Sequence, residues 1–429
     1  MKIDLDGPKI ILHNITTRAV DKNVSLFNFD QRGLVYASAG DTVITRNPMD
    51  GDYLDYLAGL GWPINEVTHV HAAGDGNSGY RYIFTRPEII AAVSRSRGYI
   101  DTYHLTTEER HFALVTGKPL YGRPEIAQRF GTKSGFASLC LQLGIPVPAG
   151  YSGLQEPDQV VRSLDALFKE GARACVVKED EGTASYGSTV IEHGEFDRMS
   201  RQERMETVAA ALHRIEQINV RSSARVEVWV DGVISSPSAQ LQVLPNGEIR
   251  FNSTHDQMLY GREQEYIGAS YPCRSAEGGI MDKFLADAQA IAAALAERGY
   301  TGHMGLDAVL TRDGELFWVD ANLRKPGTFY PRIVTERLKG SLDGVCYYAR
   351  NFHLGRGCGY SFADIYEALG EFRYDMLKGN GAVIYNMGAL APEGRLDIVS
   401  IGGCPEDARY VYGGVCSLME PLQQTDRLK

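Results

Sequence analysis

Two apolar runs near residue 310 predict a β-hairpin. Residues 304–310 and 315–322 each have the apolar and aromatic content of a buried strand. Asp313-Gly314, between them, tolerates the positive φ of a two-residue turn. Such a short turn fixes the register in which the two strands pair.

The predicted register brings two acids together. Pairing Arg312 with Glu315 across the turn places Asp307 opposite Asp320, with Asn322 one diagonal away. Two facing carboxylates repel each other unless a cation lies between them, and two acids with an amide carbonyl are oxygen ligands that suit Mg²⁺. The alternative is a hairpin whose acids face water. The apolar residues of both strands favour the metal site, because unpaired charge is costly in a buried sheet.

Short apolar runs and polar, glycine-bearing turns alternate in residues 1–120, which also include the amphipathic segment DYLDYLAGLGW. Interleaved strand and helix signals of this kind are typical of an α/β domain with a parallel sheet. The glycine-rich GDGNSG at 74–79 matches neither the P-loop nor the dinucleotide fingerprint, and it predicts a turn. His69 and His71 supply at most two ligands, so an ordinary hydrogen-bonded pair is favoured over a metal site.

The segment at 131–150, GTKSGFASLCLQLGIPVPAG, predicts a helix that is capped by Thr132 or Ser134 and ends at Gly144. Lys133 then lies in the first turn, where the helix dipole disfavours a cation. Two interpretations stay open for it. It is either a solvated lysine or one that turns out of the helix to hold an anion.

The segment at 174–191, ACVVKEDEGTASYGSTVI, predicts a strand, a loop of small residues and a returning strand. Lys178 ends the first strand, and the loop contains Thr183, Ser185 and Gly187. Small residues let backbone N–H groups and hydroxyls approach an oxyanion, and a lysine beside them adds a charge. A phosphate-binding loop and an ordinary hairpin both have this composition.

The segment at 225–236, RVEVWVDGVISS, predicts a strand that ends at Asp231-Gly232. Its backbone could pair with a purine edge as an added strand would, or it could be a plain sheet edge. The other elements predicted from the pattern are helices at 157–170, 202–217 and 281–298, strands at 239–243 and 249–253, and a C-terminal unit with strands in 381–390 and 395–403 around a turn at 392–394, followed by a helix from Pro405.

Composition narrows the class of protein. The length of 429 residues predicts about three domains. With 44 basic and 54 acidic residues, the formal charge of −10 disfavours a broad surface for nucleic acid or anionic membranes. Seven cysteines without a C-x-x-C pair indicate reduced thiols rather than disulfides or zinc. Neither a signal peptide nor a membrane span is evident, so we expect a cytoplasmic protein.

The order of these elements resembles the ATP-grasp superfamily, the carboxylate–amine ligases that include D-alanine–D-alanine ligase. The resemblance covers about residues 122–345 and implies an ATP-grasp fold that uses ATP and Mg²⁺. It implies that two lysines hold the nucleotide phosphates, that a small-residue loop closes over them and that a strand lines the adenine pocket. The residues matched to these roles are Lys133, Lys178, Thr183, Ser185, Gly187, Glu227, Trp229 and Val230.

The resemblance also implies that Asp307, Asp320 and Asn322 bind Mg²⁺. Arg324, with Lys178, would stabilise the acyl phosphate and the transferred phosphoryl group. Asp320 stands where the superfamily usually has a glutamate, which shortens the reach of the carboxylate. Ile234-Ser235-Ser236 stands where a ribose-binding acid often follows the hinge, which leaves the ribose partner open.

The flanking segments look most like the pheganomycin-type peptide ligases. This narrower resemblance implies a pre-ATP-grasp α/β domain at 1–121, the ATP-grasp core at 122–345 and a small C-terminal α+β domain at 346–429. It implies a ligase that joins a small-molecule carboxylate to an amine or peptide through an acyl phosphate, releasing ADP and phosphate, in peptide natural-product biosynthesis, and it is compatible with a homodimer. A catalytically idle nucleotide-binding module and an ATP-grasp enzyme of kinase or carboxylase type are the alternatives.

Overall fold

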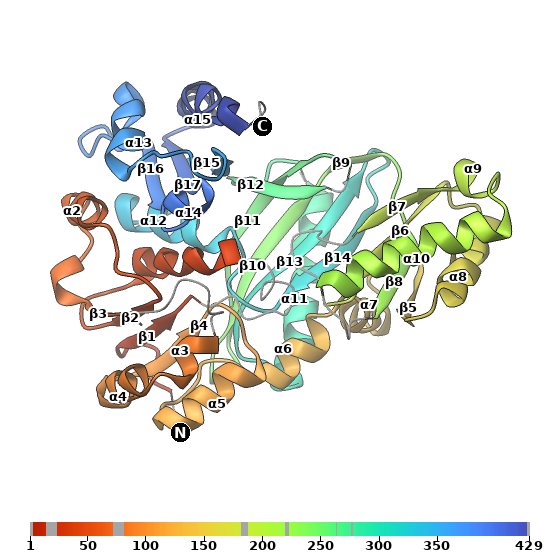
Figure 1. The fold of residues 1–429 in the computed structure, drawn as a ribbon, viewed down its shortest axis with the longest axis horizontal. Coiled ribbons are helices and arrows are strands. Elements are labelled where there is room, and N and C mark those ends of the chain that lie inside the picture. The colour runs from red at the N-terminus through yellow and green to blue at the C-terminus, as the bar shows by residue number, and fades with distance from the viewer. Residues whose placement is uncertain are drawn as a thin grey trace. The chain divides into compact units, whose positions relative to one another are not determined.

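The computed structural model (Figure 1) describes residues 3–13, 24–71, 81–181, 188–218, 223–262, 264–275 and 278–426. Two compact units divide the chain. The terminal unit is Met1–Pro124 with Gly268–Pro272 and Arg324–Lys429, and the central unit is Glu125–Ile267 with Cys273–Leu323. The division into domains at 1–121, 122–345 and 346–429 stays a prediction.

A four-stranded parallel sheet forms the first part of the terminal unit. Its strands are β1 (Lys9–Leu12), β2 (Thr42–Thr45), β3 (Thr68–His71) and β4 (Tyr99–Thr102), in the order β3-β2-β1-β4. β1 pairs with β2 on one side and with β4 on the other. The predicted α/β organisation with a parallel sheet is therefore confirmed, and the order of the strands reverses between β1 and β4.

Both faces of this parallel sheet are buried. Ile10 and Leu12 belong to one hydrophobic cluster, and Ile11 between them belongs to another. Alternate residues of a strand point to opposite faces, so the two clusters lie on either side of the sheet. The helices of this part are η1 (Val24–Tyr36), α2 (Gly51–Gly59), η2 (Ile64–Glu66), α3 (Arg81–Thr85), α4 (Pro87–Arg95) and α5 (Thr107–Thr116), of which η1 and η2 are 3₁₀ helices.

An antiparallel sheet forms the C-terminal part of the terminal unit. Strands β15 (Cys346–His353), β17 (Arg395–Gly402) and β16 (Gly381–Asn386) pair in that order, and residues 268–271 of β12 (Glu265–Tyr271) pair with β15. The predicted strands β16 and β17 and the helix from Pro405 are confirmed, whereas β15 was not predicted. The helices are α12 (Phe329–Lys339), α13 (Phe362–Ala368), η3 (Gly370–Phe372), α14 (Leu390–Glu393), α15 (Pro405–Met419) and η4 (Pro421–Asp426).

One hydrophobic core joins the two ends of the chain in the terminal unit. Leu57 of α2, Phe362 of α13 and Ile398 of β17 are buried in the same cluster. The rings of Tyr53 and Phe362 pack edge to face with their centroids 5.5 Å apart. This shared core explains why the two segments form one unit although the central unit lies between them in the sequence.

A four-stranded antiparallel sheet and two helices form one part of the central unit (Figure 1). Val177 and Val226 of the sheet share a buried cluster with Leu164 and Leu212 of the helices. The opposite face of the sheet therefore carries the alternate residues. The strands, in spatial order, are β5 (Gly150–Leu154), β8 (Ala224–Val228), β6 (Ala174–Glu179) and β7 (Thr189–Glu192), and the helices are α8 (Pro157–Lys169) and α10 (Arg201–Ile218).

A second antiparallel sheet forms the other part of the central unit. Its strands are β14 (Leu316–Asn322), β13 (Gly302–Thr311), β10 (Pro237–Val243) and β11 (Ile249–Tyr260), in that order, and β9 (Val233–Ser235) pairs with β13. Helix α11 (Gly279–Glu297) packs on β10 and β11. The remaining helices are α6 (Pro124–Phe130), α7 (Lys133–Gln142) and α9 (His193–Phe196).

The turn between β13 and β14 differs from the prediction. Thr311 and Glu315 close it, since the Thr311 amide donates to the Glu315 carbonyl at 2.9 Å. Three residues lie between them, and Gly314 has a φ of 81°. The predicted two-residue turn is therefore wrong, because the glycine takes its positive φ at the third position of a longer turn.

A β-bulge compensates for this longer turn. Near the turn Ala308 pairs with Trp318, and one step further Asp307 pairs with Asp320, so Val319 is an extra residue. The predicted pairing of Asp307 with Asp320 is thus confirmed. The bulge also reverses the face on which the following side chains lie, since side chains alternate along a strand.

Without the bulge, Trp318 and Asp320 would share one face of the sheet. The Trp318 ring instead stacks on Phe284 of α11, with the centroids 5.0 Å apart. Trp318 is fully buried in this contact. One extra residue thus lets the strand bury an aromatic ring against the helix and still direct Asp320 to the other face.

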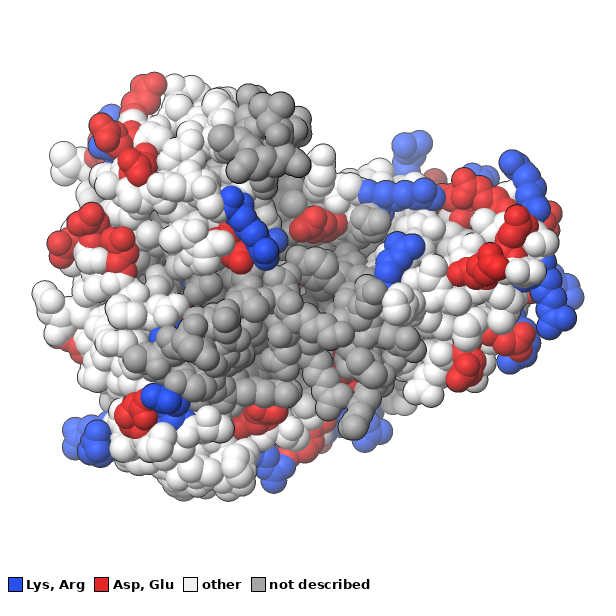
Figure 2. Space-filling view, in the orientation of Figure 1, with Lys and Arg blue, Asp and Glu red and all other residues white. Residues whose placement is uncertain are grey.

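Charged side chains of both signs are interspersed on the described surface shown in Figure 2. Within the described residues, no helix combines the length and apolar character that a membrane crossing needs.

Deleting Val319 should lower the free energy of unfolding by about 3–5 kcal/mol, the range for removing a large buried side chain. Without the extra residue, Trp318 and Asp320 would lie on the same face of the sheet, so Trp318 would lose its buried position or Asp320 would enter the core. Val319→Ala, which keeps the extra residue, should cost only about 1 kcal/mol. Urea unfolding of the two variants and the wild type measures both values. Equal stability of the deletion and Val319→Ala would show that the bulge does not set these faces.

Candidate functional site

Three of the predicted metal ligands come together on β13 and β14. Asp307 pairs directly with Asp320, so their side chains lie on the same face of the sheet. Asn322, two residues after Asp320, donates from Nδ2 to Asp307 Oδ2 at 2.9 Å. Asp307 is only 7% exposed. The structure therefore places two carboxylates and one amide on one sheet face, with Asp307 buried and Asp320 and Asn322 half-buried.

This donor set fits Mg²⁺. Carboxylate and amide oxygens are the ligands that a hard divalent cation prefers. Among the described residues, no group of three or more His, Cys, Asp or Glu could hold a metal ion, so the amide and phosphate oxygens of a substrate would complete the coordination here. Asn322 uses its amide nitrogen on Asp307, and its carbonyl oxygen is the atom that could serve as a ligand.

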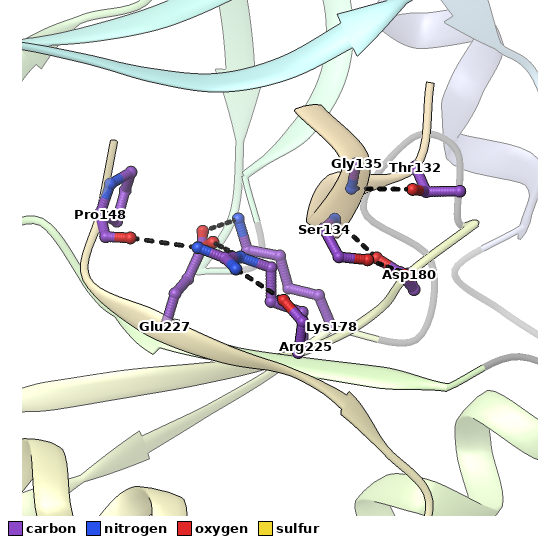
Figure 3. Close-up of polar contacts among 9 residues, drawn as sticks. Thr132, Ser134, Gly135, Pro148, Lys178, Asp180, Arg225 and Glu227 are labelled. Atoms are coloured by element: carbon purple, nitrogen blue, oxygen red, sulfur yellow. Dashed lines mark hydrogen bonds and ion pairs between the residues drawn. The ribbon is translucent and has the colours of Figure 1, made fainter. Parts of the chain in front are cut away.

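Lys178 is held by a buried acid on the neighbouring strand (Figure 3). Its Nζ forms an ion pair with Glu227 Oε1. Glu227 lies on β8 opposite Val176 of β6, and Arg225 lies opposite Lys178. The three charged side chains therefore share the face of the small sheet that is turned away from α8 and α10.

Arg225 fixes the other side of Glu227. Its Nε donates to Glu227 Oε2 at 2.7 Å, its Nη1 donates to Ser152 Oγ at 2.8 Å and its Nη2 donates to the Pro148 carbonyl at 3.2 Å (Figure 3). Burial alone would raise the pKa of Glu227, but the charges of Lys178 and Arg225 hold the pKa below its usual value. The carboxylate thus stays ionised and sets the position of Lys178.

The side chain of Glu227 has a role that the sequence did not predict. The resemblance matches Glu227, Trp229 and Val230 to the strand that lines the adenine pocket, whereas the side chain of Glu227 anchors Lys178. The Trp229 amide donates to the Ala174 carbonyl at 2.9 Å, so its nitrogen is used inside the sheet. The adenine pocket made by these residues stays a prediction.

Lys133 begins α7, as predicted, and Thr132 caps the helix by accepting from the Gly135 amide at 3.0 Å. The anion at this helix end is Asp180, which follows β6. Asp180 accepts from the Ser134 amide at 2.8 Å, and its backbone carbonyl accepts from the Lys133 amide at 3.0 Å.

This contact brings the first turn of α7 to the end of β6. Lys133 and Lys178, which the resemblance assigns to the nucleotide phosphates, therefore belong to elements that meet through one residue. Asp180 was missed from the sequence, although helix N-termini prefer anions and it stands two residues after Lys178. Thr183, Ser185 and Gly187, predicted for the phosphate loop, lie outside the described residues.

Arg324 belongs to the terminal unit and follows Asn322 by two residues. Its Nη1 donates to the Tyr103 hydroxyl at 2.9 Å and to the Lys325 carbonyl at 3.3 Å. Lys325 beside it is buried, with Nζ paired to Asp101 and donating to the Thr102 carbonyl at 2.7 Å. The arginine is thus held against the carboxyl end of β4.

No protein-family model matches the chain. It is 25% identical over 346 residues to an L-propargylglycine–L-glutamate ligase of Streptantibioticus cattleyicolor, a match that covers 74% of this chain and 70% of the relative. That relative is a ligase, and it supports the predicted likeness to carboxylate–amine ligases.

Solved structures share the fold over almost the whole chain. Carboxyaminoimidazole ribonucleotide synthase of Aspergillus clavatus, solved with ATP, has a TM-score of 0.62 at 12% identity and covers 97% of this chain, which covers 99% of it. Biotin carboxylase of Campylobacter jejuni has a TM-score of 0.63 at 12% identity, and the match covers 98% of this chain and 96% of the carboxylase. The biotin carboxylase domain of Hydrogenobacter thermophilus 2-oxoglutarate carboxylase was solved with MgADP. It has a TM-score of 0.60 at 12% identity, and the match covers 98% of this chain and 94% of that domain. The predicted ATP-grasp fold is confirmed.

Asp307→Asn should abolish stabilisation by metal. Wild-type protein should gain thermal stability when Mg²⁺ is added with ADP. The variant should melt at the same temperature with and without the metal, because losing a ligand should weaken Mg²⁺ binding by at least the roughly 10–100-fold that loss of a residue behind the ligands causes. Thermal unfolding with ADP alone and with Mg²⁺ measures this, and Asp313→Asn in the exposed turn is the control. An equal gain in the variant would remove Asp307 from the metal site.

Glu227→Gln should destabilise the central unit by about 3 kcal/mol at pH 7, since it leaves Lys178 and Arg225 without their buried counter-charge. The pKa of Glu227 is lowered by folding, so its stabilisation is present above the unfolded value of about 4.3 and lost as the pH falls through the folded value. Urea unfolding between pH 7 and pH 3 should show the gap to wild type closing in acid. Glu248→Gln, at an exposed pair with Arg250, should change little. A gap that did not depend on pH would contradict the assignment.

Proposed function

We propose that this chain, whose fold is that of the ATP-grasp enzymes, is an ATP-dependent carboxylate–amine ligase. It would activate a carboxylate as an acyl phosphate, pass the acyl group to an amine and release ADP and phosphate. The observation that carries the proposal is the placement of Asp307 and Asp320 opposite each other on one sheet face, with Asn322 bonded to Asp307. This arrangement supplies a site for the metal that accompanies a nucleotide.

Some residues of the chain would bind the nucleotide phosphates and the metal, and Arg324 would stabilise the charge that develops during phosphoryl transfer. Lys133 and Lys178 would hold the phosphates, with Glu227 keeping Lys178 in place. Mg²⁺, when bound by Asp307, Asp320 and Asn322, would neutralise phosphate charge. Arg324 would stabilise the charge that develops on the transferred phosphoryl oxygens.

The relative suggests the class of substrate. Its name states that it joins L-propargylglycine and L-glutamate. We propose that this chain also joins two small amino-acid or peptide substrates, one through a carboxylate and the other through an amine, in the biosynthesis of a peptide natural product. We also propose that the enzyme is cytoplasmic and binds neither nucleic acid nor membrane.

A carboxylase is the second candidate, because the solved structures similar to this chain include biotin carboxylases. Both candidates form ADP, so the product separates them. A carboxylase would need bicarbonate and would make no amide. An idle nucleotide-binding module would hydrolyse no ATP with any substrate.

Arg324→Ala should leave nucleotide binding nearly unchanged and lower the rate of amide formation by roughly 30- to 1,000-fold, the effect of about 2–4 kcal/mol of lost transition-state stabilisation. The assay mixes ATP and Mg²⁺ with pairs of amino acids, including L-glutamate, and follows ADP, AMP and amide by mass spectrometry. Arg312→Ala, in the exposed turn, is the matched control. Unchanged turnover would remove Arg324 from the mechanism, AMP would indicate adenylation, and ADP formed only with bicarbonate would favour the carboxylase.

A further inference from the structure

A stack of three rings stands at the carboxyl ends of β1 and β4 in the terminal unit. His13 follows β1, and Tyr103 and His104 follow β4. The Tyr103 amide donates to the Leu12 carbonyl at 2.9 Å, which extends the pairing of the two strands by one step. This is the place in the sheet where the order of strands reverses, the usual position of functional residues in open α/β sheets.

Tyr103 stacks on both imidazoles. Its ring stacks on His13 with the centroids 4.3 Å apart and the planes inclined by 29°, and on His104 at 4.9 Å and 27°. Exposure is 2% for His13, 8% for Tyr103 and 5% for His104. Burial lowers the pKa of both histidines well below the usual value. The charges of Arg32 and Lys325 add to the effect on the pKa of His13, and the charge of Arg324 adds to it on the pKa of His104. The flanking rings are therefore neutral at pH 7.

Tyr103 contacts the guanidinium of Arg324 in two ways. The hydroxyl accepts from Nη1 at 2.9 Å, and Cζ lies 5.1 Å from the centre of the ring. A hydrogen bond to a charged donor and a cation–π contact both restrict a side chain that otherwise has many rotamers. The same tyrosine thus fixes where the guanidinium lies and how it is turned.

Arg32 and Tyr330 fix His13, one of the rings that stack on Tyr103. Arg32 Nη2 donates to His13 Nε2 at 3.4 Å, so Nε2 is the acceptor and Nδ1 carries the proton that faces the Tyr330 hydroxyl. Arg32 Nη1 pairs with Asp397 on β17 at 3.3 Å. Both neighbours of His13 are buried, so the ring that supports Tyr103 is fixed on its two nitrogens.

We propose that Tyr103 is a positioning residue for Arg324. It holds the guanidinium in the orientation needed to stabilise the phosphoryl group. Tyr103 is itself kept in place by His13, which is bonded to Arg32, and Arg32 is paired with Asp397 of the C-terminal sheet. The inference rests on the proposed function, in which Arg324 acts on the transferred group. It assigns a role in catalysis to the N-terminal α/β sheet and, through Asp397, to the C-terminal sheet.

Tyr103→Phe keeps the ring stack and removes the hydroxyl that accepts from Arg324. We expect the kcat of amide formation to fall about tenfold, the effect of one hydrogen bond to a charged group, with the KM for ATP and the melting temperature unchanged. Tyr103→Leu removes the ring as well and should lower kcat further. Tyr53→Phe, at another buried tyrosine of the same unit, should leave kcat as in the wild type.

A double-mutant cycle separates positioning from a general structural effect. If Tyr103 acts through Arg324, adding Tyr103→Phe to Arg324→Gln should cause no further loss of kcat, since the partner is already gone. Equal losses in the two backgrounds, or a wild-type kcat for Tyr103→Phe, would overturn the inference while leaving the ligase activity in place. A wild-type enzyme that forms no amide with any amino-acid pair would overturn the proposed function, and this inference with it.

Discussion

The repulsion between two carboxylates inside a sheet is the constraint on which the candidate site depends. Asp307 and Asp320 are direct partners on β13 and β14, and Asp307 is buried. Like charges on directly paired strand residues repel each other, and a cation between them would remove the repulsion. The bulge at Val319 creates this situation, since it turns Asp320 to the face of Asp307 while Trp318 packs on α11. One extra residue therefore sets both the packing of Trp318 and the face of the sheet on which Asp320 lies.

At the proposed phosphate side of the site, by contrast, the buried charges are paired with one another. Lys178 is paired with Glu227, Glu227 is also bonded to Arg225, and Asp180 binds the first turn of α7. A lysine that an acid has already fixed loses little further rotamer freedom when a ligand binds, which lowers the cost of binding. In the proposed function the acid pair would bind a cation and the lysines an anion, which are the two charges of a metal–nucleotide complex.

The features that were predicted from the sequence are those that local residue patterns determine. Helices α7, α8 and α10, the strands around Lys178 and the Asp307–Asp320 pairing follow from periodicity, caps and short-range register. The pairing came out right although the turn was wrong, because the longer turn and the bulge each shift the register by one residue and their effects cancel. Asp180 and Tyr103 were missed, since their roles come from contacts with residues far away in the sequence. Arg225 was missed although Glu227 is only two residues away, because the sequence does not show that their side chains share a buried ion pair with Lys178. The shared core of the N-terminal and C-terminal segments could not be predicted for the same reason.

The most direct test is to locate a metal. Crystals grown with Mn²⁺ and a non-hydrolysable ATP analogue should show an anomalous peak bonded to oxygens of Asp307, Asp320 and Asn322 at about 2.0–2.2 Å, near the distance that Mg²⁺ adopts. The analogue's phosphates should complete the coordination. A bound nucleotide with no metal between the two acids, or with the metal elsewhere, would contradict the account.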